Sequence, residues 1–266
     1  RFAEAGADRD ALIAAGGAEA AQAHLLRASL AMVRGEPEAA MRDCSATFGQ
    51  TDLLAATACI ATAQALRGRA ANSLAALEAV LPRSAAAPLE TQRWARISAA
   101  EIAARLNEPA RAETHYRAAL QLMASAGVRD PYLLASYADA LLAWNRPAEV
   151  LDLLRGLERI DVLLLRLALA EDRLGADGGR RDALVAQLAT RFADTRARGD
   201  IVHQREYAWF LLDLRREPSL ALEAALANWQ EQHEVLDARL LLRAAIAAKR
   251  PESAQPVLDW LRTTGV

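Results

Sequence analysis

The chain has 266 residues, of which 53% are hydrophobic, 25% are charged and 5% are aromatic, and its net charge is −2. This composition is typical of a folded chain with a sizeable core, and it excludes a disordered chain, a collagen-like chain and a disulfide-dense scaffold. About a quarter of the residues are alanine, the strongest helix former, whereas β-branched and aromatic residues never alternate over a strand-length run. The sequence therefore predicts an all-α fold and argues against a β-sandwich or a parallel-sheet enzyme.

The charged residues also limit the classes of partner. Basic residues are spread along the chain rather than gathered in a stripe, so we expect no nucleic-acid partner. Lysine occurs once, at Lys249, and arginine supplies the other 31 basic residues, which together with the alanine content indicates a GC-rich bacterial genome. The longest uncharged stretch, 53–66, is shorter than the roughly 20 residues that span a bilayer, so we expect no membrane insertion. The first residue is Arg1 rather than Met, which predicts either a removed leader, and so an exported protein, or an internal fragment.

Residues 1–20, with adjacent glycines at Gly16 and Gly17, predict a partial leading helix or cap. Beyond them, apolar segments of helical period alternate with short turns, and five of the nine prolines stand at such a turn. Proline suits the first turn of a helix because it has no amide hydrogen, and a glycine or asparagine just before it can end the preceding helix in the left-handed conformation. The five turns are Gly35-Glu36-Pro37, Asn107-Glu108-Pro109, Asn145-Arg146-Pro147, Arg216-Glu217-Pro218 and Lys249-Arg250-Pro251.

The spacing of these prolines is 72, 38, 71 and 33 residues, which indicates a repeat of roughly 33–39 residues with one proline-free unit inside each long gap. A turn at Gly68 fills the first gap, and the segment 175–179 fills the second. Each repeat is predicted as a helix A, a turn of two or three residues and a helix B. Asp130 and Asp161 are expected to begin two of the A helices.

Small residues and one aromatic residue complete the pattern around Pro109. Ala112, Tyr116 and Ala119 follow this proline at intervals of three, four and three residues, and Ala100 precedes it. The pattern resembles the tetratricopeptide repeat. The segment 196–265, with Asn228-Trp229 and Val257-Leu258-Asp259-Trp260-Leu261, resembles bacterial tetratricopeptide-like proteins that have no assigned activity. Other units carry parts of it at Ala28, Ala40, Cys44 and Thr47, at Ala61, Ser73, Leu77 and Val80, and at Ala138, Val150, Leu154 and Leu157.

This resemblance implies a right-handed α-solenoid of about seven antiparallel helix pairs, in which stacking buries the face that a single pair cannot bury. The whole chain, 1–266, is then one domain, with close matches over 21–158 and divergent repeats over 159–266. The divergence shows where Trp209 and Leu242 occupy places that are small in the family.

Proteins of this family bind peptides or protein segments in a concave groove lined by the A helices. The resemblance therefore predicts a non-enzymatic scaffold with a protein or peptide partner. Some members grip a C-terminal carboxylate with a set of Lys, Arg and Asn, and the single Lys249 argues against such a clamp. The groove positions carried over to this chain are Trp94, Ile97, Glu101, Arg105, Tyr132, Ala135, Asp139, His203, Glu206, Asp213, Arg239 and Arg243.

No motif predicts catalytic residues, a metal site or a cofactor: the chain has no glycine-rich phosphate loop, no His-Glu-x-x-His and no Cys-x-x-Cys. The most polar segment, 196–206, places His203 and Glu206 on one helical face, so an enzyme or small-molecule receptor with a polar pocket there is one alternative. A helix start capped by Asp200 with solvated charges is the plainer interpretation of the same residues. A structural, self-associating array is the second alternative, and the oligomeric state stays open.

In a stack of helix pairs, Cys44 falls on helix B of the first unit and Cys59 on helix A of the second, which are neighbours. A disulfide between them is then geometrically possible and would indicate an oxidising compartment such as the periplasm. The alternative is two reduced, buried thiols in a cytoplasmic protein. Together with the first residue, the pairing favours an exported, periplasmic protein.

Overall fold

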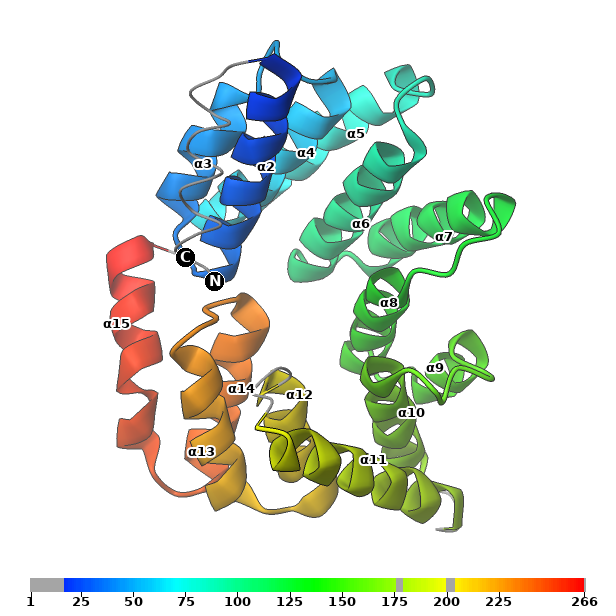
Figure 1. Ribbon diagram of the computed structural model, residues 1–266, viewed down its shortest axis with the longest axis vertical. Coiled ribbons are helices and arrows are strands. Elements are labelled where there is room, and N and C mark those ends of the chain that lie inside the picture. The colour runs from blue at the N-terminus through cyan, green and yellow to red at the C-terminus, as the bar shows by residue number, and fades with distance from the viewer. Residues whose placement is uncertain (1–16, 176–178, 200–203, 266) are drawn as a thin grey trace. The chain divides into compact units, whose positions relative to one another are not determined.

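The computed structural model describes residues 17–175, 179–199 and 204–265 (Figure 1). Over these ranges the chain is helical with connecting turns and contains no strand, which confirms the all-α prediction. The chain divides into two compact units, one comprising Arg1–Val128 with Leu261–Val266 and the other Arg129–Trp260.

In the first unit, consecutive helices pack in pairs, α2 on α3, α4 on α5 and α6 on α7, and the alternate helices α2, α4 and α6 also contact one another in sequence. The elements of this unit are α2 (Gly17–Val33), α3 (Pro37–Ala46), α4 (Leu53–Gln64), η1 (Ala65–Arg69), α5 (Ala70–Val80), η2 (Leu81–Arg83), α6 (Leu89–Arg105) and α7 (Pro109–Ser125).

The second unit shows the same kind of contacts. Here α8 packs on α9, α10 on α11 and α12 on α13, while α8 also contacts α10 and α12 also contacts α14. Its elements are α8 (Pro131–Ala143), α9 (Pro147–Leu153), α10 (Asp161–Leu174), α11 (Gly179–Ala197), α12 (Gln204–Trp209), η3 (Phe210–Arg215), α13 (Pro218–Trp229), α14 (Val235–Ala247) and η4 (Pro251–Ala254). The last helix, α15 (Gln255–Thr264), crosses the boundary between the two units.

The five proline turns share one backbone geometry. Each proline is the first residue of a helix, α3, α7, α9, α13 or η4. The residue two places before each proline is left-handed, with φ of 67° at Gly35, 58° at Asn107, 57° at Asn145, 59° at Arg216 and 56° at Lys249. The predicted helix starts are therefore confirmed at all five places, and the left-handed ends are confirmed at Gly35, Asn107 and Asn145. Arg216 and Lys249 adopt the same conformation although the prediction covered only glycine and asparagine.

Backbone hydrogen bonds close these turns in the way expected for a helix that ends in a left-handed residue. At the first turn the amide of Glu36 donates to the carbonyl of Ala31 at 2.8 Å, and the amide of Gly35 donates to that of Met32 at 3.1 Å. The same two bonds recur before Pro109, Pro147 and Pro251. Before Pro218, the amide of Glu217 donates to the carbonyl of Leu211, which lies six positions earlier rather than five. Each turn thus satisfies the last carbonyls of one helix and starts the next.

The predicted proline-free turns also occur. Gly68, with φ of 74°, interrupts the helix between α4 and α5, and Gly175, with φ of 63°, ends α10. Asp130 caps α8, and its carboxylate accepts the backbone N–H of Tyr132 at 2.9 Å. Asp161 is the first residue of α10 as expected, but Ile160 occupies the cap position and makes no side-chain cap.

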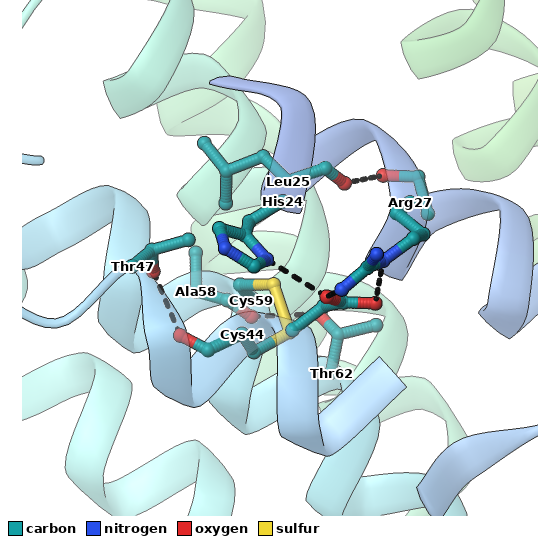
Figure 2. The surroundings of a disulfide bond; sticks show 10 residues. His24, Leu25, Arg27, Cys44, Thr47, Ala58, Cys59 and Thr62 are labelled. Atoms are coloured by element: carbon teal, nitrogen blue, oxygen red, sulfur yellow. Dashed lines mark hydrogen bonds and ion pairs between the residues drawn. A yellow bond between two sulfur atoms is a disulfide. The ribbon is translucent and has the colours of Figure 1, made fainter. Parts of the chain in front are cut away.

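The core of the first unit is built from small residues and a disulfide. Ala28, Ala40 and Ala63 are fully buried around Cys44 of α3 and Cys59 of α4. The two cysteines form a disulfide with their Cα atoms 5.3 Å apart, and both are fully buried (Figure 2). Of the two alternatives left open by the sequence, the structure therefore contains the disulfide, which ties α3 to α4.

The core of the second unit is centred on α10. The side chains of Leu163, Leu164, Leu165, Leu167 and Ala168 are all fully buried. A helix that is apolar on every side is surrounded by protein. Any charged group on this stretch of α10 is consequently taken out of solvent and needs partners within the unit.

Candidate functional site

The predicted groove residues lie on α6 in the first unit and on α8, α12, η3 and α14 in the second. His203 lies outside the described residues.

In the first unit the α6 positions differ in exposure. Trp94 is partly buried and packs against the alanine core around the disulfide. Ile97 is only 3% exposed, so the structure makes it a core residue and corrects its assignment to the groove. Glu101 and Arg105 are partly exposed.

In the second unit, Tyr132 and Ala135 of α8 differ in solvent exposure. The ring of Tyr132 is 61% exposed, whereas Ala135 is buried at 9% exposure. Arg239 on α14 is exposed. The other four predicted positions carry charges, and each has a partner on a neighbouring element.

Asp139 of α8 is paired with Arg166 of α10, a residue that was not among the predicted ones. The Arg166 guanidinium donates to both carboxylate oxygens, from Nε to Oδ1 at 2.8 Å and from Nη2 to Oδ2 at 2.7 Å. Its third nitrogen, Nη1, donates to the carbonyl of Val162 at 3.0 Å. The Arg166 side chain is 5% exposed and that of Asp139 is 14% exposed, so this is a buried, two-pronged ion pair.

Glu206 of α12 approaches the same guanidinium from the other side, with Oε1 3.8 Å from Nη1 of Arg166. The Trp209 ring also faces this guanidinium, with its centroid 5.3 Å away. Burial alone would lower the pKa of Arg166, but the carboxylates of Asp139 and Glu206 together raise it above its ordinary value. Glu206, which the sequence places with His203 in a candidate polar pocket, therefore lies beside a permanently charged arginine.

A second buried network joins α12 to α14. Arg205 donates to Asp237, from Nε to Oδ1 at 2.5 Å and from Nη2 to Oδ2 at 2.8 Å. Asp237 is 2% exposed, and it also accepts the Nδ2 amide of Asn228 at 2.7 Å and the backbone N–H of Glu234 at 2.9 Å. Burial would lower the pKa of Arg205, and the hydrogen bonds of Asp237 with the charge of Glu234 outweigh it and raise that pKa. This network connects the N-terminal end of α14 to α12.

The third pairing places Asp213 between two donors. The indole Nε1 of Trp209 donates to Oδ2 of Asp213 at 2.7 Å, and Nη2 of Arg243 donates to Oδ1 at 2.5 Å. The Asp213 side chain is 14% exposed, whereas that of Arg243 is 51% exposed. Asp213 is thus largely buried, and it accepts a hydrogen bond from a half-exposed arginine, Arg243.

An open hollow of about 240 Å³ lies beside this pairing and is lined by Leu169, Asp172, Arg173, Asp213, Arg216 and Arg243. Arg216, in the left-handed turn before α13, donates from Nη2 to Oδ2 of Asp172 at 2.7 Å. Arg181 donates to the other oxygen of Asp172 at 3.1 Å. Arg173 donates to the main-chain carbonyl of Leu142 rather than to a carboxylate.

The hollow therefore has more positive than negative charge. Asp172 is shared by two arginines, and within the described ranges Arg173 donates to a main-chain carbonyl rather than to a carboxylate. The Arg216 side chain is 64% exposed. Half-exposed guanidinium groups with fixed positions suit planar carboxylate groups, which they can bind through two parallel hydrogen bonds.

The described residues hold no group of three or more His, Cys, Asp or Glu side chains placed to bind a metal ion. Within the same ranges, no helix has the length and apolar character needed to cross a bilayer. The chain matches no model of a known protein family and no curated protein sequence.

Arg166, Arg173 and Arg216 were missed because the resemblance points only to groove positions on the family pattern. A signal for Arg166 was present: it is the only charged residue in the apolar run 162–170. A lone charge inside an apolar helix indicates a buried partner. No comparable local signal marks Arg173 or Arg216, since both stand among other charged residues.

Proposed function

We propose that the chain is a non-enzymatic scaffold of the tetratricopeptide-like kind, in which about seven helix pairs stack as a right-handed α-solenoid. The recurring turn geometry at the five prolines supports a repeated unit. The contacts between alternate helices within each unit support stacking of successive pairs.

Burial at the places that carry the family resemblance supports the same proposal. Tyr116 is 1% exposed, and the small residues around it are fully buried, as close packing of two helices requires. The buried positions are Ala28, Ala40, Cys44, Thr47, Ala61, Ser73, Leu77, Ala100, Ala112, Ala119, Ala138, Val150, Leu154 and Leu157. Val80, which is also part of the pattern, is only partly buried.

The partner that fits best is an acidic segment of a protein or peptide, bound at the hollow of the second unit. The side chains of Arg216 and Arg243 are both more than half exposed, and the guanidinium group of each is hydrogen-bonded to a largely buried aspartate. This observation carries the proposal. Because Asp172 and Asp213 fix these guanidinium groups in advance, less side-chain entropy is lost when a carboxylate binds. The open form of the hollow suits a segment of chain that runs across it.

A library of random twelve-residue peptides displayed on phage tests this proposal. We expect selection on the wild-type chain to enrich peptides with neighbouring Asp and Glu residues. The Arg216→Ser/Arg243→Ser variant should not enrich them, while Arg155→Ser, which removes an arginine with a 78% exposed side chain elsewhere on the second unit, should behave as the wild type. Enrichment of peptides without acidic residues, or equal enrichment on the double variant, would overturn the assignment.

We also propose that the protein works in an oxidising compartment, the periplasm of a bacterium. The fully buried disulfide between Cys44 and Cys59 supports this, since structural disulfides persist in exported proteins and are rare in the cytosol. Alkylation of free thiols in native-host cells lysed directly into denaturant, followed by mass spectrometry, should find both cysteines unmodified. Two alkylated cysteines would place the protein in a reducing compartment instead.

A further inference from the structure

A second open hollow, of about 310 Å³, lies on the first unit between α2 and α3. Three arginines line it, Arg27, Arg34 and Arg42, together with the carboxylates of Glu36 and Asp43. Its volume falls at the lower end of the range of small-molecule pockets, which is about 300–1,000 Å³. None of these residues belongs to the site described on the second unit.

One of the two carboxylates is already neutralised inside the protein. Asp43 is 4% exposed, and it accepts the Nε of Arg27 at 2.8 Å on Oδ1 and at 2.7 Å on Oδ2. The Nδ1 atom of His24 lies 2.8 Å from Oδ1 (Figure 2). Burial would raise the pKa of Asp43, but the hydrogen bonds from Arg27 and His24 lower it, so the carboxylate is charged and matched by Arg27. Because the charge of Asp43 is balanced by Arg27, this carboxylate at the base of the hollow should repel an incoming anion little.

Arg42 stands at the rim of the hollow, and its side chain is exposed. Its expected partner one turn earlier on α3, Glu38, is engaged elsewhere: Nε of Arg67 donates to Oε1 of Glu38 at 3.1 Å. No carboxylate among the described residues accepts a hydrogen bond from Arg42. Its guanidinium consequently keeps its hydrogen-bond donors for a group that enters the hollow.

The disulfide holds this arrangement in place. Cys44 follows Asp43 directly on α3, and its bond to Cys59 ties that part of α3 to α4 (Figure 2). A site whose charged groups lie on a covalently anchored helix is held in position before a ligand arrives.

We propose that the hollow between α2 and α3 is a binding site for an oxyanion group, a carboxylate or phosphate of a small molecule, with Arg42 as its binding residue. The paired Asp43 and Arg27 form its base, and Glu36 at the rim opposes binding and limits affinity. This site is independent of the peptide-binding function proposed for the second unit, and either proposal can fail without the other.

Isothermal titration calorimetry of the full chain with succinate and, separately, with inorganic phosphate tests the proposal. We expect at least one probe to bind saturably at one site. The Arg42→Gln variant should bind that probe about tenfold more weakly, because a charge-assisted hydrogen bond is lost. Arg69→Gln makes the same change of charge at an exposed position outside the hollow and should bind as the wild type does. The probe that binds distinguishes a carboxylate ligand from a phosphate ligand.

Three further variants test the charges around Arg42. Arg67→Gln releases Glu38 to pair with Arg42, and it should weaken binding about threefold. Adding Glu38→Gln to that variant should restore wild-type binding, and Glu36→Gln alone should strengthen it. Circular dichroism checks that each variant keeps its helical content. The proposal is overturned if neither probe binds saturably, or if Arg42→Gln and Arg69→Gln change the affinity equally.

Discussion

Arg166 of α10 and Asp139 of α8 form a buried ion pair in which two guanidinium nitrogens donate to the two oxygens of one carboxylate, at 2.8 and 2.7 Å. The pair joins two helices that are each the first of a helix pair, and Glu206 and Trp209 of α12 extend it to a third. The ion pair and its extension thus link α8, α10 and α12 within the second unit.

Removing one partner of this pair should lower the free energy of unfolding more than removing both partners. Asp139→Ala leaves a buried guanidinium without its main partner and should lower the free energy of unfolding by about 3–5 kcal/mol. The double variant Asp139→Leu/Arg166→Met removes both charges and should lose less than about 2 kcal/mol. Urea unfolding followed by circular dichroism measures both values.

The exposed pair of Arg155 and Asp152 serves as the control, since their side chains are 78% and 69% exposed. Arg155→Ala should change the free energy of unfolding by less than about 0.5 kcal/mol. A similar loss in Arg155→Ala and Asp139→Ala would contradict the role given to burial.

Glu78 makes the first unit sensitive to acid. Hydrogen bonds from Arg111, and then from His115, lower the pKa of this carboxyl to about 2, against the partial opposing effect of burial. Because the pKa in the folded state lies below that in the unfolded state, the stabilisation is complete above pH 4.5 and is lost as the pH falls toward 2. In Glu78→Gln the free energy of unfolding should fall less steeply between pH 5 and 2 than in the wild type, with a difference of about 2 kcal/mol after allowance for the partial exposure of Glu78. Parallel slopes in urea titrations across this range would refute the assignment.

His115 should add a pH dependence at higher pH. Its side chain is 6% exposed, and burial lowers its pKa below the ordinary value of 6.5 despite the opposing effect of Glu78. The unfolded chain therefore takes up a proton that the folded chain does not, and stability falls as the pH drops below 6.5. In His115→Gln this decline should disappear between pH 7 and 5.5, as read from the midpoint of thermal unfolding at each pH. An unchanged decline would assign it to another group.

The disulfide should stabilise the first unit by about 3 kcal/mol, because it closes a loop with a sequence separation of 15 in the unfolded chain. Cys44→Ala/Cys59→Ala should therefore unfold at a lower urea concentration than the oxidised wild type. Wild type that has been unfolded, reduced and refolded in a thiol reductant should shift in the same direction, which separates the crosslink from the lost side-chain volume. If reduction is complete by mass spectrometry and the midpoint does not move, the crosslink does not stabilise the fold.

Lys249 occupies the left-handed position of the turn before η4, with φ of 56°. A side chain with a Cβ atom is strained there by roughly 1 kcal/mol, whereas glycine is not. Lys249→Gly should raise the free energy of unfolding by about 0.5 kcal/mol, and Lys249→Val should lower it by more than about 1 kcal/mol, because a β-branched residue fits the conformation least well. Equal stability of the two variants would show that this turn tolerates other backbone conformations.

Features that depend on neighbouring residues were predictable from the amino-acid sequence alone. The starts of α3, α7, α9 and α13 follow from the shape of proline, and the left-handed residues before α3, α7 and α9 follow from the conformational freedom of glycine and asparagine. The all-α class follows from alanine content and the absence of alternating strand patterns.

The pairings of the charged side chains were decided only by the tertiary structure. Asp139 and Arg166 are 27 residues apart, Asp213 and Arg243 are 30 apart, and Arg205 and Asp237 are 32 apart. At such separations, the choice of partner depends on which faces of two helices pack together and on their relative position along the helix axes. The local sequence around an arginine does not determine either of these. The same reason explains Ile97: the periodicity of α6 does not determine which of its faces is covered, and packing buried this side chain.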